Sequence, residues 1–311
     1  MAAASYIGIS MVTERQVAGA GILLVLIYAL QFLTARASLQ GHITPAGLTV
    51  LRFYAAGALF LPYICKASAR AEVAQLGLAK IITLSVLAGF PYLMVINTGI
   101  SLTSAGYVAT VGPGSIVLFS FLLPLFLLKA TPDRVSIIST ALITLGILLF
   151  IYNTFLAKGL SPVGTALFVL QGLMFSLYGV LIKRWQVSPV LGTAVVSLVS
   201  CLPAFAAHAV TPTGFAQSTM AEILFQAFTQ GILAGAAAIF LYTYIVQKSG
   251  PQRASLVMPS VPIITTVAGC LLLKEPLSAV QVVGLISMAL GMAMPGLAAL
   301  RRKHPTAVTS T

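Results

Sequence analysis

Long apolar runs constrain the fold of this chain more than any other feature of its sequence. Ten runs of about 20 residues, the length that crosses a bilayer as a helix, follow one another with short connections. Hydrophobic residues make up 59% of the chain and charged residues 7%, whereas a soluble domain carries roughly a quarter charged residues. We therefore predict an all-α membrane protein with ten transmembrane helices. They lie near residues 17–34, 45–64, 77–98, 104–128, 134–153, 161–182, 189–210, 222–246, 252–273 and 279–299.

Basic residues gather at alternate span ends, as the positive-inside rule requires. With the N-terminus in the cytoplasm, the outer ends hold only Arg36, Lys158 and Lys274, and Arg52 lies within the second span. We therefore predict that both termini are cytoplasmic, and we read the net charge of +12 as membrane orientation rather than nucleic-acid affinity. The inner ends hold Arg15, Lys66, Arg70, Lys80, Lys129, Arg134, Lys183, Arg184, Lys248, Arg253, Arg301, Arg302 and Lys303.

One helix-end pattern occurs twice at a constant separation. Lys129 and Lys274 each end a leucine-rich run, and each is followed by a run that ends in Leu-Gly, at Gly146 and Gly291; both separations are 145 residues. Chance similarity between leucine-rich helices is the alternative, but the shared offset favours an internal duplication. An odd number of spans per unit inverts the second copy, so we predict inverted five-helix repeats over residues 1–155 and 156–311.

The second half carries a recognisable pattern. It runs through Ala254, Leu256, Pro259, Leu271-Leu272-Leu273, Glu275, Pro276-Leu277, Gln281, Gly284 and Leu290-Gly291. This stretch, with Leu51-Arg52-Phe53 in the second span, resembles the ten-helix EamA-type branch of the drug/metabolite transporter (DMT) superfamily. The chain departs from the family pattern at Ala130-Thr131-Pro132, where an acidic turn is usual, and at Lys274, where a small residue is usual.

The resemblance implies a function. It implies an inner (plasma) membrane exporter of small metabolites, most often amino acids, and the tyrosine-rich interior is similar to exporters of the aromatic and neutral type. The expected partners are a small-molecule substrate and membrane lipid. Two alternatives stay open: a channel-like facilitator of another small polar metabolite, and a membrane-embedded enzyme acting on a lipid carrier.

The polar residues argue against chemistry and against ion coupling. All five carboxylates and the three histidines fall at span ends or in turns, whereas a proton-coupled carrier holds such a group inside the bundle. No phosphate-binding loop, Gly-x-Ser-x-Gly elbow or metal-ligand spacing occurs in the sequence. We expect no catalytic residue, metal or cofactor, and we predict facilitated transport by alternating access.

Proline and glycine mark expected helix breaks, whose free backbone groups would bind substrate. They lie at Gly89 and Pro91 in the third span, at Gly112-Pro113-Gly114 in the fourth, and at Pro259 and Pro262 in the ninth. At the repeat offset Gly114 falls opposite Pro259, and Ser115 opposite Ser260. Prolines are also common in membrane helices without any function, but the matched positions favour a binding site.

Embedded polar side chains complete the predicted site. Gln171 is the strongest polar candidate, because an amide near mid-span is costly against lipid. Tyr92 and Tyr178 lie deep enough to face a cavity rather than an aromatic belt. The remaining polar candidates are Tyr28, Gln31, Asn97 and Tyr242.

Arg52 is the only embedded charge in the sequence. It could bind a substrate carboxylate, pair with Glu222 or Glu275, or cap helix carbonyls; the structural interpretations are favoured. Gly231 and Gly235 form a Gly-x-x-x-Gly face in the eighth span, which permits close helix approach. We assign this face to internal packing, and the expected state is a monomer.

Overall fold

The computed structural model describes residues 2–103, 105–129, 131–158, 161–255, 257–258, 260–261, 263–264 and 278–303. These ranges are helical apart from short connections and contain no strand. The elements are α1 (Ala2–Gln40), α2 (Pro45–Ile64), α3 (Ala67–Leu76), α4 (Leu78–Ala88), α5 (Phe90–Ser101), α6 (Ala105–Leu127), α7 (Arg134–Lys158), α8 (Pro162–Arg184), α9 (Pro189–Val210), η1 (Phe215–Gln217), α10 (Met220–Gln226), η2 (Ala227–Ala237), α11 (Ala238–Ser249), α12 (Pro251–Ser255) and α14 (Ala279–Lys303).

The helices confirm a multi-pass membrane protein. In the described part of the chain, six helical segments are long and apolar enough to span a bilayer. They are Glu14–Gln40, Pro45–Ile64, Leu78–Ser101, Pro162–Arg184, Pro189–Val210 and Met220–Ser249. Shorter apolar stretches of α6, α7 and α14 correspond to the predicted fourth, fifth and tenth spans. The predicted ninth span, 252–273, lies largely outside the described residues.

Three of the helices begin with a hydroxyl residue followed by proline. The side-chain oxygens of Thr44, Ser161 and Ser188 each accept a hydrogen bond from the backbone N–H three residues later, at 3.1, 3.1 and 3.3 Å. Proline at the first helical position needs no hydrogen-bond acceptor, so the pair defines a sharp helix start. Thr44 and Ser188 lie 144 residues apart, and each starts the second span of its unit.

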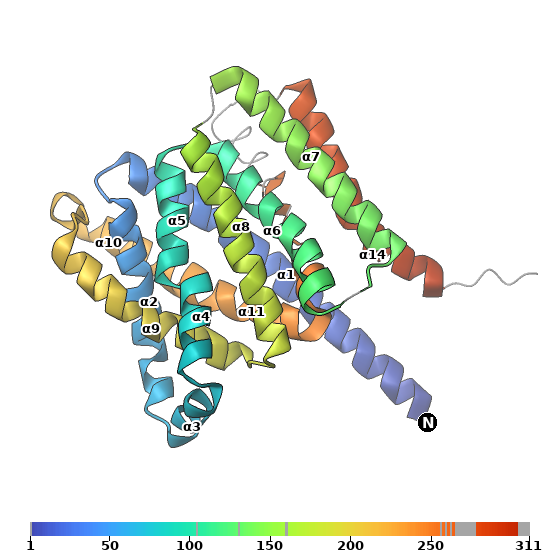
Figure 1. Ribbon diagram of the computed structural model, residues 1–311, viewed down its shortest axis with the longest axis horizontal. Helices are drawn as coiled ribbons and strands as arrows, with labels where there is room; N and C mark the ends of the chain where they lie inside the picture. Colours follow the sequence, from blue (N-terminus) through green and yellow to red (C-terminus); the bar gives the residue numbers. More distant parts are fainter. Residues whose placement is uncertain are drawn as a thin grey trace, which may run out of the picture.

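The fifth spans of the two units, α7 and α14, lie side by side and run antiparallel (Figure 1). A Cβ on Gly146 would lie 2.5 Å from the carbonyl oxygen of Gly284, and a Cβ on Gly291 would lie 2.8 Å from that of Ser139. Gly146 and Gly291 are 145 residues apart, and so are Ser139 and Gly284. The two contacts are therefore related by the repeat itself, which explains why the glycine pattern recurs.

The second spans, α2 and α9, also pair antiparallel. The start of α2 meets the end of α9, where the Thr44 N–H donates to the Thr213 carbonyl at 3.2 Å. Further along, the Cys201 thiol donates to the Phe53 carbonyl at 3.1 Å. When equivalent helices of two repeats pack antiparallel, the pseudo-two-fold axis that relates the repeats runs perpendicular to the helices. This is consistent with the predicted inverted arrangement.

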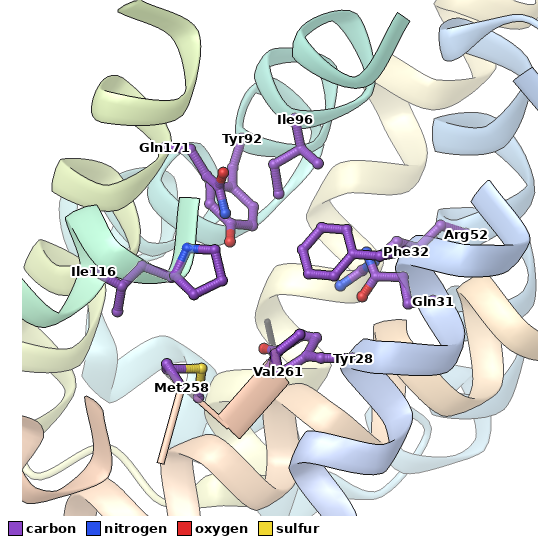
Figure 2. Close-up of a pocket in the computed structure, with 11 residues that line it drawn as sticks. Tyr28, Gln31, Phe32, Arg52, Tyr92, Ile96, Ile116, Gln171, Met258 and Val261 are labelled. Carbon is purple, nitrogen blue, oxygen red and sulfur yellow. The ribbon is translucent and has the colours of Figure 1, made fainter. Parts of the chain in front are cut away.

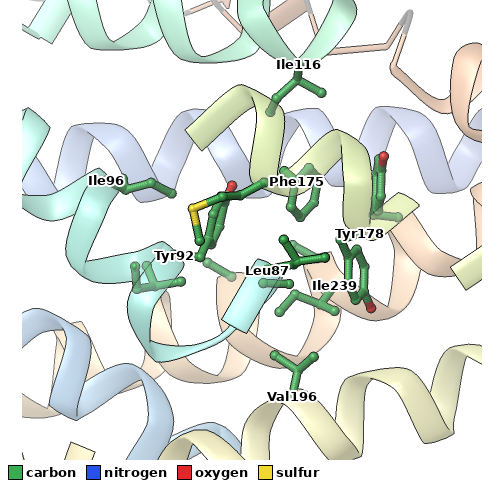
Figure 3. Packing of buried hydrophobic residues seen from close by; sticks show 14 of the residues in the cluster. Leu87, Tyr92, Ile96, Ile116, Phe175, Tyr178, Val196 and Ile239 are labelled. Carbon is green, nitrogen blue, oxygen red and sulfur yellow. The ribbon is translucent and has the colours of Figure 1, made fainter. Parts of the chain in front are cut away.

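The buried core lies where α4, α5, α8, α9 and α11 converge (Figure 3). Aromatic rings form its centre: Phe175 lies 5.4 Å from Tyr92 and 4.4 Å from Tyr242, measured between ring centroids. Leu87, Val196 and Ile239 enclose these rings. Helices of both units contribute to this core, and Tyr92 belongs both to the core and to the lining of the pocket described below.

Cysteine labelling is expected to fix the membrane orientation. Figure 1 places α3 at the same end of the molecule as the N-terminus, which charge sorting assigns to the cytoplasm. Cys65, just before α3, is exposed. In a Cys201→Ala/Cys270→Ala background, an impermeant maleimide should label Cys65 in inverted vesicles but not in intact spheroplasts.

A cysteine at the other end serves as the control for labelling. Gln217 is exposed in the connection between α9 and α10. Gln217→Cys, in a chain without other cysteines, should label in intact spheroplasts. The opposite pattern for the two positions would contradict the orientation.

Candidate functional site

A pocket lies between the two units of the chain (Figure 2). Helices α1, α2, α5 and α6 of the first unit form one part of its wall, and α8, with Met258 and Val261, forms the part from the second unit. The lining side chains are Tyr28, Gln31, Phe32, Arg52, Tyr92, Ile96, Pro113, Ile116, Gln171, Met258 and Val261.

Arg52 reaches the pocket because α2 packs unusually close to η2. A Cβ on Gly231 would meet the Cβ of Ala55, and a Cβ on Gly235 would lie 3.1 Å from the Cγ of Arg52. The Gly-x-x-x-Gly face therefore packs inside the molecule, as predicted. Nη2 of Arg52 donates to the Ala234 carbonyl at 2.8 Å. This carbonyl belongs to a π-helical segment, a geometry that is frequent at functional sites.

The Arg52 guanidinium is only partly hydrogen-bonded by the described residues. Only 2% of the residue is exposed, and Nε and Nη1 have no hydrogen-bond acceptor among the described residues. A buried cation that lacks hydrogen bonds is costly, and more so within a membrane. The arrangement therefore leaves donors available to a pocket ligand.

Gln171 enters the pocket from α8 opposite Gly112. A Cβ on Gly112 would lie 2.6 Å from Oε1 of Gln171, so only glycine leaves room for the amide in this position. The amide lies against the Tyr92 hydroxyl (Figure 2). Oε1 is buried and has no donor among the described residues. Gln171 thus lines the same pocket as Arg52 and carries an acceptor that no described residue uses.

Gln31 and Tyr28 lie one helical turn apart on α1. The Gln31 backbone carbonyl accepts from Nε2 of Gln230 at 3.2 Å, and the same Nε2 donates to Oγ1 of Thr34 at 3.2 Å. These bonds fix α1 against η2. They leave the Gln31 side chain directed to the pocket, with its Oε1 unpartnered among the described residues.

No described side chain that lines the pocket is acidic. Glu14, Glu72 and Asp133 are exposed, and Glu222 is half-buried. Of the acidic partners considered for Arg52, Glu222 accepts from Oγ of Ser38 at 3.1 Å. The other, Glu275, lies outside the described residues. Capping of a helix carbonyl is the interpretation of Arg52 for which the structure shows a contact.

Five of the residues expected at a binding site converge on this pocket. They are Tyr28, Gln31, Arg52, Tyr92 and Gln171. They come from four different helices, so the sequence alone could not establish that they share one space.

The other candidates contact protein rather than the pocket. The Tyr178 hydroxyl bonds Oγ1 of Thr243 at 3.0 Å, and Tyr242 packs on the same aromatic core. Asn97 donates from Nδ2 to Oγ1 of Thr49 at 2.9 Å, which joins α5 to α2. The Ser260 hydroxyl donates to Sδ of Met292 at 3.3 Å.

The predicted break in the fourth span is wrong. Helix α6 continues from Ala105 to Leu127 through Gly112-Pro113-Gly114. Gly114 instead permits close packing, because a Cβ there would lie 2.7 Å from Cδ1 of Ile147 on α7. Ser115 likewise packs against Gly172 of α8. The proposed repeat partner of Gly114, Pro259, lies outside the described residues.

Breaks do occur in the third span and in its repeat partner, the eighth. Gly89 separates α4 from α5, as predicted. The Ser200 hydroxyl lies beside this break and accepts a hydrogen bond from the Phe90 N–H at 3.0 Å. The eighth span is irregular at η2, whose π-helical turns carry no proline. Sequence reasoning missed η2 for that reason.

Sequence reasoning also missed the apolar part of the lining. No polarity or spacing distinguishes these side chains from those that face lipid or core. Pro113 is predicted from the sequence only as a helix breaker. The residues are Phe32, Ile96, Pro113, Ile116, Met258 and Val261.

Comparison with known proteins agrees with this architecture. Residues 17–152 and 162–295 each match the EamA-like transporter family. A solved structure titled "Crystal structure of protein" shares the fold, with a TM-score of 0.65 at 18% identity, and the match covers 93% of this chain and 99% of that one. No curated protein matches the sequence.

Proposed function

The chain belongs to the EamA-like transporter family, whose members move small molecules across membranes, and we propose that it exports amino acids across the inner membrane by alternating access. One observation carries the proposal. Side chains from both units line one pocket between those units and carry buried polar atoms with no hydrogen-bond partner among the described residues. A carrier that rocks one unit against the other needs its substrate site at that junction.

The composition of the pocket suits a small zwitterion. Arg52 supplies positive charge, Gln31 and Gln171 supply acceptors, and the tyrosines offer ring faces that attract a cation. No carboxylate or histidine is among the described lining residues, and these are the groups that proton-coupled carriers use. This composition supports facilitated transport, in which the substrate gradient sets the direction.

Counterflow in proteoliposomes is the direct test. The purified protein should accelerate uptake of a labelled amino acid when unlabelled amino acid is loaded inside, with saturation and without an imposed pH gradient. The panel includes amino acids, nucleosides and sugar phosphates. Linear flux without trans-stimulation would indicate a channel, and a requirement for a pH gradient would indicate proton coupling.

A further inference from the structure

The unpartnered groups in the pocket differ in character, and the difference points to how a ligand is oriented. Arg52 presents hydrogen-bond donors, whereas Gln171 and Gln31 present acceptors. Resting on the proposed transport function, we infer that Arg52 binds the carboxylate and Gln171 the ammonium of neutral α-amino acids with apolar side chains.

The geometry of Arg52 supports its role as the carboxylate anchor. Its bond to the Ala234 carbonyl uses Nη2 and holds the guanidinium in place, which leaves Nε and Nη1 for a ligand. A fixed guanidinium loses little further side-chain entropy when it binds a carboxylate.

Gln171 fits the ammonium for complementary reasons. Its Oε1 is an acceptor without a donor among the described residues, and Gly112 holds open the space that it occupies. The neighbouring Tyr92 adds a ring face and a hydroxyl. The amide and the aromatic ring bind an ammonium although neither carries a negative charge. Because the zwitterion is neutral overall, the net charge of the occupied pocket is that of Arg52 alone.

The rest of the lining selects the side chain of the ligand. Apart from Tyr28 and Gln31 it is apolar, and it comes from both units: Phe32, Ile96, Pro113, Ile116, Met258 and Val261. A charged ligand side chain would meet no oppositely charged partner among the described lining residues other than Arg52, so its desolvation would be costly. A dicarboxylate would likewise lack a second cation, so neutral apolar amino acids fit best.

Ligand analogues test the inference with the full chain. Labelled L-phenylalanine counterflow is measured in competition with L-phenylalaninamide, which lacks the carboxylate, and with 3-phenylpropionate, which lacks the ammonium. Wild-type protein should prefer the amino acid to its amide by about 10- to 100-fold, the value of a hydrogen bond to a charged group. Arg52→Gln should abolish this preference, and Arg52→Lys should reduce it.

Matched controls separate the anchors from general effects of substitution. Arg36 also donates to backbone carbonyls, those of Ile100 and Thr103, but does not line the pocket, so Arg36→Gln should keep the preference. Gln171→Leu should weaken the binding of L-phenylalanine without changing the binding of 3-phenylpropionate. Asn97→Leu, a buried amide outside the pocket, should leave the ratio of the two ligands unchanged.

The outcomes distinguish this inference from the transport proposal. Equal competition by the amide in wild-type protein overturns the carboxylate anchor, and this result needs no variant to fold. Retained selectivity in a folded Arg52→Gln protein overturns the role of Arg52. Counterflow of another solute but not of L-phenylalanine or L-leucine overturns the ligand class, whereas no counterflow of any panel solute refutes the transport proposal.

Discussion

Gly172→Leu is expected to prevent α6 and α8 from packing and to destabilise the protein more than any other single change considered. A Cβ at this position would overlap the Cβ of Ser115 and lie 2.7 Å from its carbonyl carbon and 2.9 Å from the backbone nitrogen of Ile116. Because backbone cannot move aside as a side-chain tip can, the helices must separate. Overpacking of this kind costs about 1–3 kcal/mol, and more where the obstacle is backbone.

Thermal unfolding in detergent measures this effect. The expected result is a large fall in Tm, or no accumulation of folded protein. Gly19→Leu is the matched control, because nothing lies within 4 Å of a Cβ at Gly19 and that residue is exposed. A Gly172→Leu protein with the Tm of wild type would show that α6 and α8 are not in contact at this point.

Arg52→Met is expected to abolish carboxylate-selective transport while leaving the fold as stable as wild type, or more stable. Removal of a cation within a membrane span relieves a cost of at least about 2.5 kcal/mol when the charge is poorly paired. Replacement of a buried charge by an apolar side chain of similar volume is often neutral or stabilising. The lost bond to Ala234 offsets part of this gain, at roughly 1.5–3 kcal/mol for a hydrogen bond to a charged group.

Tm and counterflow, measured on the same preparation, check the prediction. Arg36→Met provides the comparison, because Arg36 is only partly buried and donates to two carbonyls at a helix end. Its loss should lower the Tm slightly and preserve transport. A strongly destabilised Arg52→Met protein would show that Arg52 has a structural role rather than a ligand-binding role.

Much of the fold could be predicted because the membrane restricts the chain to helices and because the repeat leaves a trace in sequence. Gly146 and Gly291 recur since each fills the same contact between α7 and α14. Arg52 and Gln171 could be selected because a polar group at mid-span is costly without a role. Both lie in the pocket.

The remaining features depend on contacts between distant segments. The proline and glycines of α6 resemble a helix break in sequence. In the structure the helix continues, and side chains of α7 and α8 pack against the glycines. The π-helical η2 has an ordinary sequence, and its geometry provides the Ala234 carbonyl for Arg52. Apolar lining residues such as Met258 and Ile116 become distinguishable only when the helices are placed together.

The reciprocal contact between α7 and α14 has a consequence for how such a chain could arise. Gly146 contacts Gly284, and their repeat partners, Gly291 and Ser139, contact each other in the same way. This is the rule of an isologous dimer interface. Two separate copies of a five-helix ancestor, inserted in opposite orientations, would join through the same glycines. Fusion of their genes would need no new surface, only a connection between the end of one copy and the start of the next.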